Sequence, residues 1–153
     1  MSKLTVSTDV ANEIKMTRTF AAPKRLVHRA MTEPELLKRW LGGDCSKVLS
    51  VEIDPRVGGT FKYVYGQPDG SSFSFSGTYQ EINDSRSVHT EMFNGQPPPA
   101  IVTTTLVEQE GKTTMTMVMS FDSQEIRDMV LGTGMADGAG QSYDHLDRVL
   151  ATL

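Results

Sequence analysis

The fold is decided by residues 124–153, QEIRDMVLGTGMADGAGQSYDHLDRVLATL. Apolar residues recur there every three or four positions, in two stripes that are out of phase with each other. The first stripe is Ile126, Met129, Val130 and Thr133; the second is Met135, Ala139, Tyr143, Leu146, Val149, Leu150 and Leu153. One straight helix cannot bury both stripes, and Gly132-Thr133-Gly134 favours ending one helix and starting another. We therefore predict a short helix over 124–131 and a long helix over 135–153.

The first half of the long helix carries small residues where bulky apolar side chains are usual. These residues are Gly138, Ala139, Gly140 and Ser142. Each glycine inside a helix costs about 1 kcal/mol relative to alanine, so some feature of the fold must offset this cost. Either another backbone approaches closely, or this part of the helix covers an open space. Close packing is the commoner arrangement, because empty interior volume is rare.

Upstream of these helices the chain predicts mostly β-structure. Residues 13–20 alternate as a strand, and two short helices follow, the first starting at Ala22-Pro23 and the second at Thr32-x-Pro34. From residue 49 to 121 the apolar period is two, which is typical of strands. The clearest strand is 72–79, where serines and threonine alternate with larger residues. Turns are predicted at Asp69-Gly70, Asn83-Asp84, Asn94-Gly95 with the prolines 97–99, and Glu110-Gly111.

These elements predict an α+β domain over 13–153, preceded by a polar lead-in over 1–12. A meandering antiparallel sheet of about six to seven strands needs one face covered. The C-terminal helix alone has the length and the apolar stripe to cover it. A curved sheet gripping this helix would enclose a space beneath 135–142.

Composition argues against several functional classes. The net charge is −4 without a long basic run, so neither nucleic acid nor an anionic membrane is an expected partner. No segment approaches the roughly 18 apolar residues of a membrane span, and the N-terminus lacks a signal-peptide core. The single cysteine, Cys45, cannot form an internal disulfide, so we expect a cytoplasmic protein.

Short motifs along the chain resemble a known family. They are Ala22-Pro23, Thr32-x-Pro34-Glu35, Trp40, Asp54-x-Arg56-x-Gly58-Gly59, Gly77-x-Tyr79-x-Glu81-Ile82, Arg127-Asp128, Gly134-Met135, Gly138 and Leu146. Together and in this order they resemble the bacterial relatives of the Hsp90-ATPase-activator domain, within the START/Bet v 1-like (SRPBCC) superfamily. The resemblance covers about residues 14–153 and implies the helix-grip fold. It implies function less narrowly, because the superfamily spans lipid carriers, cyclases, dioxygenase subunits and co-chaperones.

Two departures from the family pattern affect function. The eukaryotic activator carries an additional N-terminal domain with no counterpart in these 153 residues, so direct co-chaperone activity is not expected. Glu91 stands where such strands often carry an aromatic residue.

Residue types that carry chemistry are few. His28, His89 and His145 have no partners at metal-ligand spacing, so we expect no metal and no other cofactor. Cys45 has no adjacent base, which favours an inert thiol. Asp54-x-Arg56 beside paired glycines is better explained as a structural hairpin than as a site.

His89 and Glu91 are the one polar pair of interest, since they are two apart on a predicted strand and share a face. Facing inward, they could do acid–base work in an apolar cavity. The alternate face, Val88, Thr90 and Met92, is a better inward set, and buried unpaired charges are costly. We therefore expect His89 and Glu91 to face solvent, with no catalytic residues assigned.

The methionines and aromatic residues fit either a methionine-rich core or, together with the small residues at 138–142, an apolar pocket. Methionine adapts to varied apolar shapes, and Met115, Met117 and Met119 share one strand face. The predicted ligand-binding residues are Trp40, Phe73, Phe75, Tyr79, Met115, Met117, Met119, Met135, Gly138, Ala139, Ser142 and Tyr143. The family resemblance implies that Trp40 borders the mouth of the pocket. The preferred function is binding of a small, largely apolar molecule, as a carrier or sensor without a cofactor. The alternatives are a cyclase- or hydrolase-like enzyme using His89 and Glu91, and a module that binds an Hsp90-type chaperone.

Overall fold

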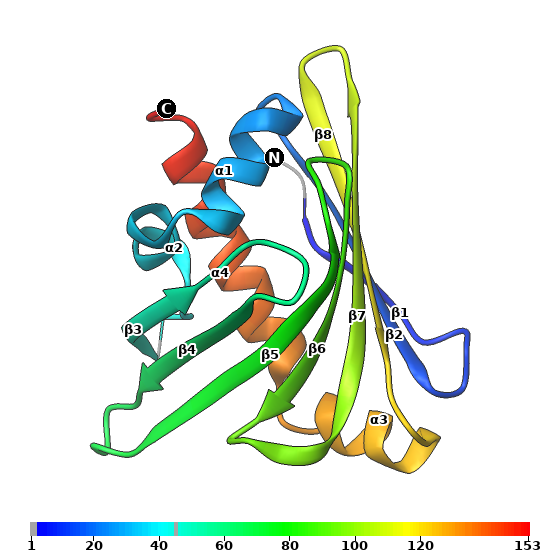
Figure 1. Cartoon of the computed structure of the whole chain (residues 1–153). Helices are drawn as coiled ribbons and strands as arrows, with labels where there is room; N and C mark the ends of the chain where they lie inside the picture. The colour runs from blue at the N-terminus through cyan, green and yellow to red at the C-terminus, as the bar shows by residue number, and fades with distance from the viewer. Residues whose placement is uncertain (1–2, 45) are drawn as a thin grey trace.

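One antiparallel sheet wraps around the C-terminal helix (Figure 1). The computed structural model describes residues 3–44 and 46–153, so the predicted inert thiol of Cys45 lies outside the described residues. Within them, eight strands follow the order β1-β2-β8-β7-β6-β5-β4-β3. The strands are β1 (Thr5–Ser7), β2 (Glu13–Phe20), β3 (Lys47–Ile53), β4 (Thr60–Gly66), β5 (Ser72–Ile82), β6 (Arg86–Phe93), β7 (Gln96–Gln109) and β8 (Lys112–Ser120).

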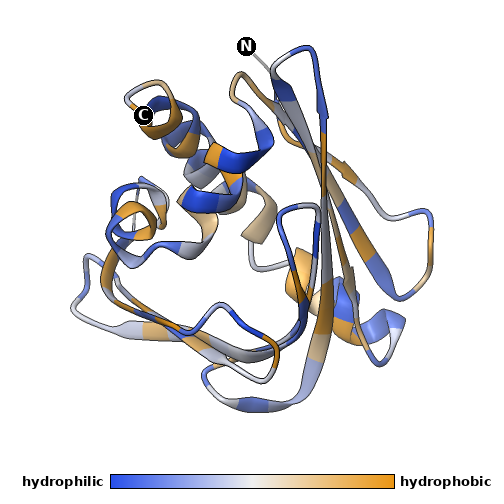
Figure 2. Ribbon diagram, turned by 45° about the horizontal axis from the view of Figure 1, so that its top comes forward, coloured by the Kyte–Doolittle hydropathy of each residue, from blue (hydrophilic) through white to orange (hydrophobic). Residues whose placement is uncertain are grey.

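Four helices accompany the sheet within the described residues. They are α1 (Lys24–Thr32), α2 (Pro34–Trp40), α3 (Gln124–Leu131) and α4 (Met135–Leu150). The break between α3 and α4 falls at the predicted glycines, where Gly134 has a positive φ of 80°. Figure 2 shows the sheet curving around α4, and α1 and α2 pack directly against this helix. The α+β helix-grip prediction is confirmed.

Two details differ from the prediction. The polar segment 1–12 contributes a short edge strand, β1, which raises the strand count to eight. The three residues of β1 are too few to show the alternation of apolar and polar residues that is typical of a strand. The prolines 97–99 belong to β7 rather than to a turn, and they precede Ile101, where pairing with β8 starts. Their missing N–H groups therefore interrupt no hydrogen bonds to β8.

Every second residue of a strand projects onto the concave face of the sheet. On β2 this face consists of Ile14, Met16, Arg18 and Phe20, all buried. The C-terminal half of α4 buries Tyr143, Leu146, Val149 and Leu150 in a core shared with α1 and α2. Met135 and Ala139, in its first half, pack against a second core cluster formed mainly by β2, β7 and β8.

Arg18 joins the sheet to α4 through a buried ion pair. Its Nη1 lies 2.6 Å from Asp144 Oδ1, and its Nη2 lies 2.7 Å from Asp147 Oδ2. The two aspartates are three residues apart, so both side chains project from the same side of the helix. Burial lowers the pKa of Arg18, but the hydrogen bonds and charges of the two carboxylates outweigh it and raise the pKa above its ordinary value.

Replacing Arg18 with Met should destabilise the protein, because it leaves two carboxylates facing an apolar side chain. We expect a loss of about 2–4 kcal/mol in the free energy of unfolding, since Asp144 remains partly hydrated. Urea unfolding measures it. Arg56→Met is the matched control, because Arg56 Nε lies 2.7 Å from Asp54 Oδ2 at an exposed site, where ion pairs contribute little. Equal effects of the two substitutions would contradict a structural role for the buried pair.

Gly77 allows β5 and β6 to approach each other in an interrupted stretch of their ladder, just before the register shift between Tyr79 and Glu81. Regular pairing stops after Ser76↔Met92 and resumes at Tyr79↔His89, and between them Thr78 N donates to Thr90 Oγ1 at 3.0 Å. A Cβ atom on Gly77 would collide with the Thr90 carbonyl oxygen. Glycine is therefore required here by close backbone approach.

The substitution Gly77→Ala should cost on the order of 1–3 kcal/mol or more, because backbone cannot move aside as a side chain can. Thermal unfolding measures the loss. Gly138→Ala serves as the control, since a Cβ there would meet nothing within 4 Å. It should gain up to about 1 kcal/mol from helix propensity. A stable Gly77→Ala variant would show that the strands can separate locally.

Candidate functional site

His89 and Glu91 face the helix side of the sheet, so the prediction that they face solvent is wrong. His89 lies opposite Tyr79 on β5 and Val102 on β7, and Glu91 lies opposite Ala100. These three cross-strand partners are all buried. Residues directly opposite each other in a sheet project from the same face. The polar pair therefore belongs to the concave face.

The apolar pattern of β6 misled the prediction because its more apolar face is the outer one. Thr90 and Met92 line a hollow of about 370 Å³ on the convex side, together with Lys62 and Thr78. Met92 is half-buried in the lining of this hollow. Predictions from the pattern of apolar residues tend to fail at functional or strained sites, so β6 is a candidate location for a functional site.

His89 packs against aromatic rings beside Glu91. Its ring meets Phe61 edge-on at 5.0 Å and Tyr79 at 5.6 Å between ring centroids. Its Nε2 lies 3.6 Å from Glu91 Oε1, while its Nδ1 is buried without a hydrogen-bond partner among the described residues. The side chains of His89 and Glu91 remain 13% and 22% exposed. The pair is thus enclosed by aromatic groups yet within reach of solvent.

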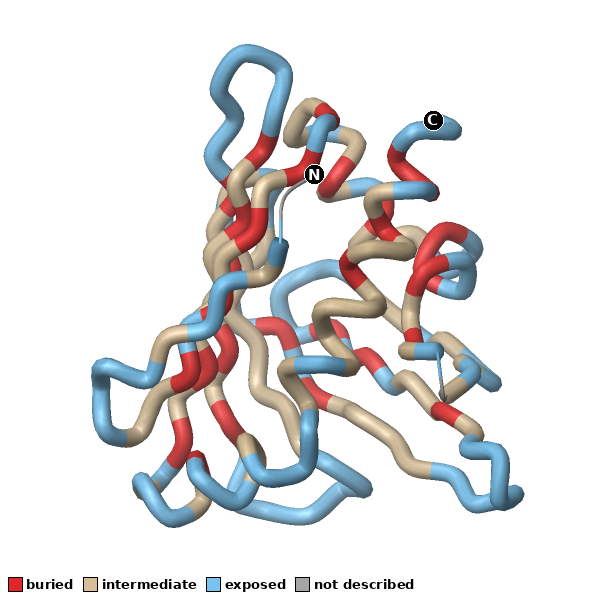
Figure 3. Tube along the Cα trace, turned by 180° about the vertical axis from the view of Figure 1, so that it is seen from behind, coloured by how far each residue is buried: buried red, intermediate tan, exposed pale blue. Residues whose placement is uncertain are grey.

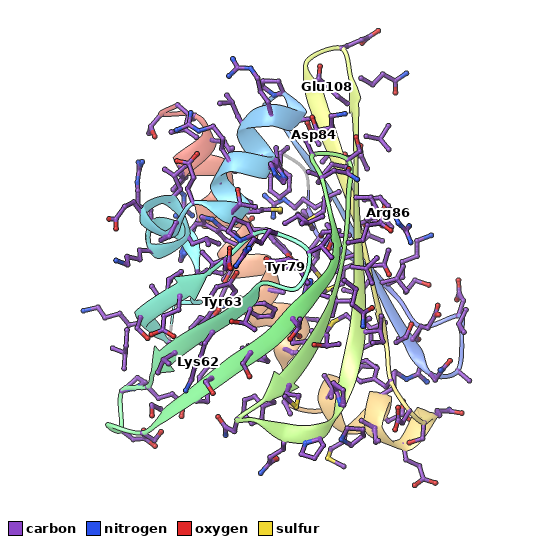
Figure 4. All side chains as sticks on the ribbon, viewed as in Figure 1. Lys62, Tyr63, Tyr79, Asp84, Arg86 and Glu108 are labelled. Atoms are coloured by element: carbon purple, nitrogen blue, oxygen red, sulfur yellow. The ribbon has the colours of Figure 1, made fainter. Side chains whose placement is uncertain are left out.

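The negative charge of Glu91 acts on all four tyrosines of the chain, and one of them, Tyr79, packs directly against His89. Tyr63 and Tyr79, labelled in Figure 4, both pack against Phe61, with ring centroids 5.0 and 5.7 Å from its ring. Burial raises the pKa of Tyr63, Tyr65, Tyr79 and Tyr143, and the negative charge of Glu91 raises each of them further. The site therefore presents neutral phenol groups around a carboxylate.

The predicted ligand-binding residues divide by burial. Trp40, Tyr79, Met115, Met119 and Tyr143 are buried, whereas Phe73, Phe75, Met117, Met135, Gly138, Ala139 and Ser142 are only half-buried. Tyr143 connects several of them, because it stacks on Trp40 at 5.8 Å and its hydroxyl lies 3.9 Å from Met117 Sδ. Phe73 and Phe75 form a separate aromatic cluster with Tyr65 and Phe93.

The structure places Trp40 in the core rather than at an exposed edge. Its side chain is 6% exposed, and its indole N–H donates to the Ala30 carbonyl at 2.8 Å. Direct contact with Tyr143 still couples it to the concave face.

The first half of α4 is neither exposed nor closely covered. Figure 3 shows this stretch mostly as intermediate, in contrast to the buried positions toward the C-terminus. A Cβ atom on Gly138 would meet nothing within 4 Å, although a Cβ on neighbouring Gly43 would lie 3.7 Å from the Gly138 Cα. The backbone at Gly43 therefore approaches Gly138 on one side, while the direction in which a side chain at position 138 would project is open. Since Met135 and Ala139 pack toward β2, β7 and β8, Gly138 lies on the flank toward the α2–β3 connection.

Sequence reasoning missed Arg18 and placed no weight on Tyr63. A signal for Arg18 was present: it occupies the buried phase of β2, between Met16 and Phe20, while Asp144 and Asp147 share a side of the last helix. Asp54, Arg56 and the paired glycines form a structural turn, as predicted, with Gly58 at a φ of 82°.

Two further findings concern the described part of the chain, residues 3–44 and 46–153. No three side chains of His, Cys, Asp or Glu there come close enough together to hold a metal ion. None of its helices is both long and apolar enough to cross a membrane.

The tyrosines provide a test of the site by pH. An unfolded tyrosine ionises at about pH 10, and the folded values are higher, so folding protects all four phenols. The contribution of the four neutral phenols to the free energy of unfolding is complete below about pH 10. It is lost as the pH rises toward the pKa values of the tyrosines in the folded protein. Ultraviolet absorbance should show tyrosinate in the native protein only as it unfolds, whereas protein in urea should titrate at about pH 10. Ionisation of any tyrosine at about pH 10 without unfolding would contradict the described burial.

Comparisons with solved structures agree with this fold. A protein from Rhodobacter sphaeroides is 28% identical, with a TM-score of 0.91 over 99% of each chain. A protein from Nitrosomonas europaea is 26% identical, with a TM-score of 0.84 over 94% of this chain and 97% of that one. The AHSA1-like protein from Aeromonas hydrophila is 16% identical and shares the fold, with a TM-score of 0.70 over 90% and 92%. No curated protein matches the chain.

The family model described as "Activator of Hsp90 ATPase homolog 1-like protein" matches residues 21–151. That range includes every helix and all of the sheet except β1 and β2. The chain therefore belongs to the Activator of Hsp90 ATPase homolog 1-like family, within the SRPBCC/Bet v 1-like fold.

Proposed function

We propose that this protein binds a small, largely apolar molecule between the sheet and the first half of α4. The observation that carries the proposal is the open direction at Gly138, in a half of α4 where Met135, Ala139 and Ser142 are only half-buried. Apolar surface that is shielded but not fully packed is the usual setting for a ligand, because binding removes it from water.

The residues around this region suit a ligand of varied shape. Met117 and Met135 are flexible and half-buried, so they can adjust to an occupant without opening the closely packed core. Phe73 and Phe75 add aromatic surface from β5. A carrier or sensor in the cytoplasm requires no chemistry beyond such binding.

Catalysis is the second candidate, and the inward placement of His89 and Glu91 favours it. An imidazole and a carboxylate 3.6 Å apart, beside the Tyr63 and Tyr79 hydroxyl groups, could transfer protons in an acid–base reaction. A panel of apolar esters and lactones tests it. Turnover by wild type that is lost in His89→Gln would support an enzyme. Equal turnover by wild type and His89→Gln would remove this candidate.

The family's description suggests the third candidate, binding to an Hsp90-type chaperone. Purified protein can be tested against the purified Hsp90 homologue of its own host. Saturable binding that changes the chaperone's ATPase rate would support this candidate, and no binding would remove it.

The substitution Gly138→Leu tests the apolar site directly. The leucine side chain has room, and leaving glycine gains nearly 1 kcal/mol of helix propensity, so the midpoint of unfolding should hold or rise. The side chain should also occupy the ligand's space. We expect the affinity for N-phenyl-1-naphthylamine, a neutral apolar dye, to fall about tenfold or more, because several apolar contacts of the dye are lost.

Gly138→Ala is the control, because it gains the same helix propensity while adding only a methyl group. Dye fluorescence and the emission of Trp40, the only tryptophan, provide two independent signals. If the dye binds wild type and both variants equally, the site does not lie beneath Gly138. A large loss of stability in Gly138→Leu would show that this flank of α4 is closely packed.

A further inference from the structure

Glu91 is a carboxylate without a hydrogen-bond donor. Across the described residues, no N–H or O–H group lies within hydrogen-bonding distance of its side chain, and the one charged group near it is His89, at 3.6 Å. His89 balances the charge only when its ring is protonated. Carboxylates enclosed by apolar groups are normally paired, because burying an unpaired charge is costly. This one is still partly exposed, so a ligand can reach it.

The surrounding charges do not neutralise Glu91. Arg18 is the guanidinium on the same face, and it already bridges Asp144 and Asp147. Among these four residues, three carboxylates (Glu91, Asp144 and Asp147) therefore face one permanent cation, Arg18. Such an excess attracts a cation and repels an anion.

Aromatic rings add to this preference. Tyr63, Tyr65, Tyr79 and Tyr143 all lie close enough for the charge of Glu91 to act on their hydroxyl groups. Phe61 and Tyr79 hold the His89 ring beside it. The faces of aromatic rings carry partial negative charge and attract ammonium groups. A carboxylate beside the Phe61, Tyr79 and His89 ring cluster is a suitable receptor for an organic cation.

We propose that the ligand is an apolar molecule that carries a protonated amine, with the ammonium group bound by Glu91 and the apolar part beneath the first half of α4. This inference rests on the proposed binding function and specifies its ligand class. Glu91 would act as the specificity-determining residue, since it supplies charge where the surrounding groups supply mostly apolar surface.

The test compares three probes that share an apolar part and differ in their polar end: 4-phenylbutylamine, 4-phenylbutanol and 4-phenylbutyrate. Calorimetry at pH 8 measures their affinities, with the amine still protonated. We expect the amine to bind about tenfold more tightly than the alcohol, because it gains a charge-assisted hydrogen bond and cation–π contacts. The carboxylate should bind most weakly.

Glu91→Gln should abolish the preference for the amine and leave the affinity for the alcohol unchanged. Glu81→Gln is the matched control: it removes the same charge from β5, where Glu81 Oε2 pairs with Arg86 Nε at 2.9 Å, and should leave all three affinities unchanged. Equal binding of amine and alcohol to wild type, or an amine preference that persists in Glu91→Gln, would overturn the inference alone. Failure of all three probes to bind would overturn the binding function and the inference with it.

Discussion

The ion pair between Arg18 and the two aspartates of α4 is the constraint on which the architecture depends. This ion pair sets the rotation of α4 about its own axis, because Asp144 and Asp147 must face β2. Tyr143 and Leu146 then point into the core. The side of α4 that carries Gly138 faces the α2–β3 connection. A charged contact specifies geometry more narrowly than apolar contacts do, because its hydrogen bonds are directional. The apolar core then supplies most of the stability around a helix that is already oriented.

Much of this architecture could be predicted from residue patterns. The glycines at 132 and 134, the alternation in β5 and the apolar stripe from Met135 to Leu150 each indicate an element that the structure contains. These signals are local, since they depend on the period of one helix or strand. β1 gave no such signal, because its three residues are held by pairing with β2 rather than by their own pattern.

The candidate site could be predicted less well, because it depends on contacts between strands. The face on which Glu91 lies is set by its register with Ala100, and the close approach at Gly77 and the register shift between Tyr79 and Glu81 decide how β6 meets β5. Neither is visible along one strand, where Val88 and Met92 look like the better inward residues. Burial of Trp40 is likewise a result of how α1, α2 and α4 pack together.

The pairing of β2 with β8 also has a consequence for how the protein forms. The sheet joins residues from the start of the chain, such as Ile14, to residues near its end, such as Met119. During synthesis β3 to β7 can assemble as hairpins. β2 can pair with β8 only after β8 is made, and the concave face can be covered only after α4, which follows all eight strands in the chain. Closing such a long loop is entropically costly and slows folding. The nascent chain therefore exposes its apolar concave face until α4 has been synthesised, which is the interval in which a general chaperone would protect it from aggregation.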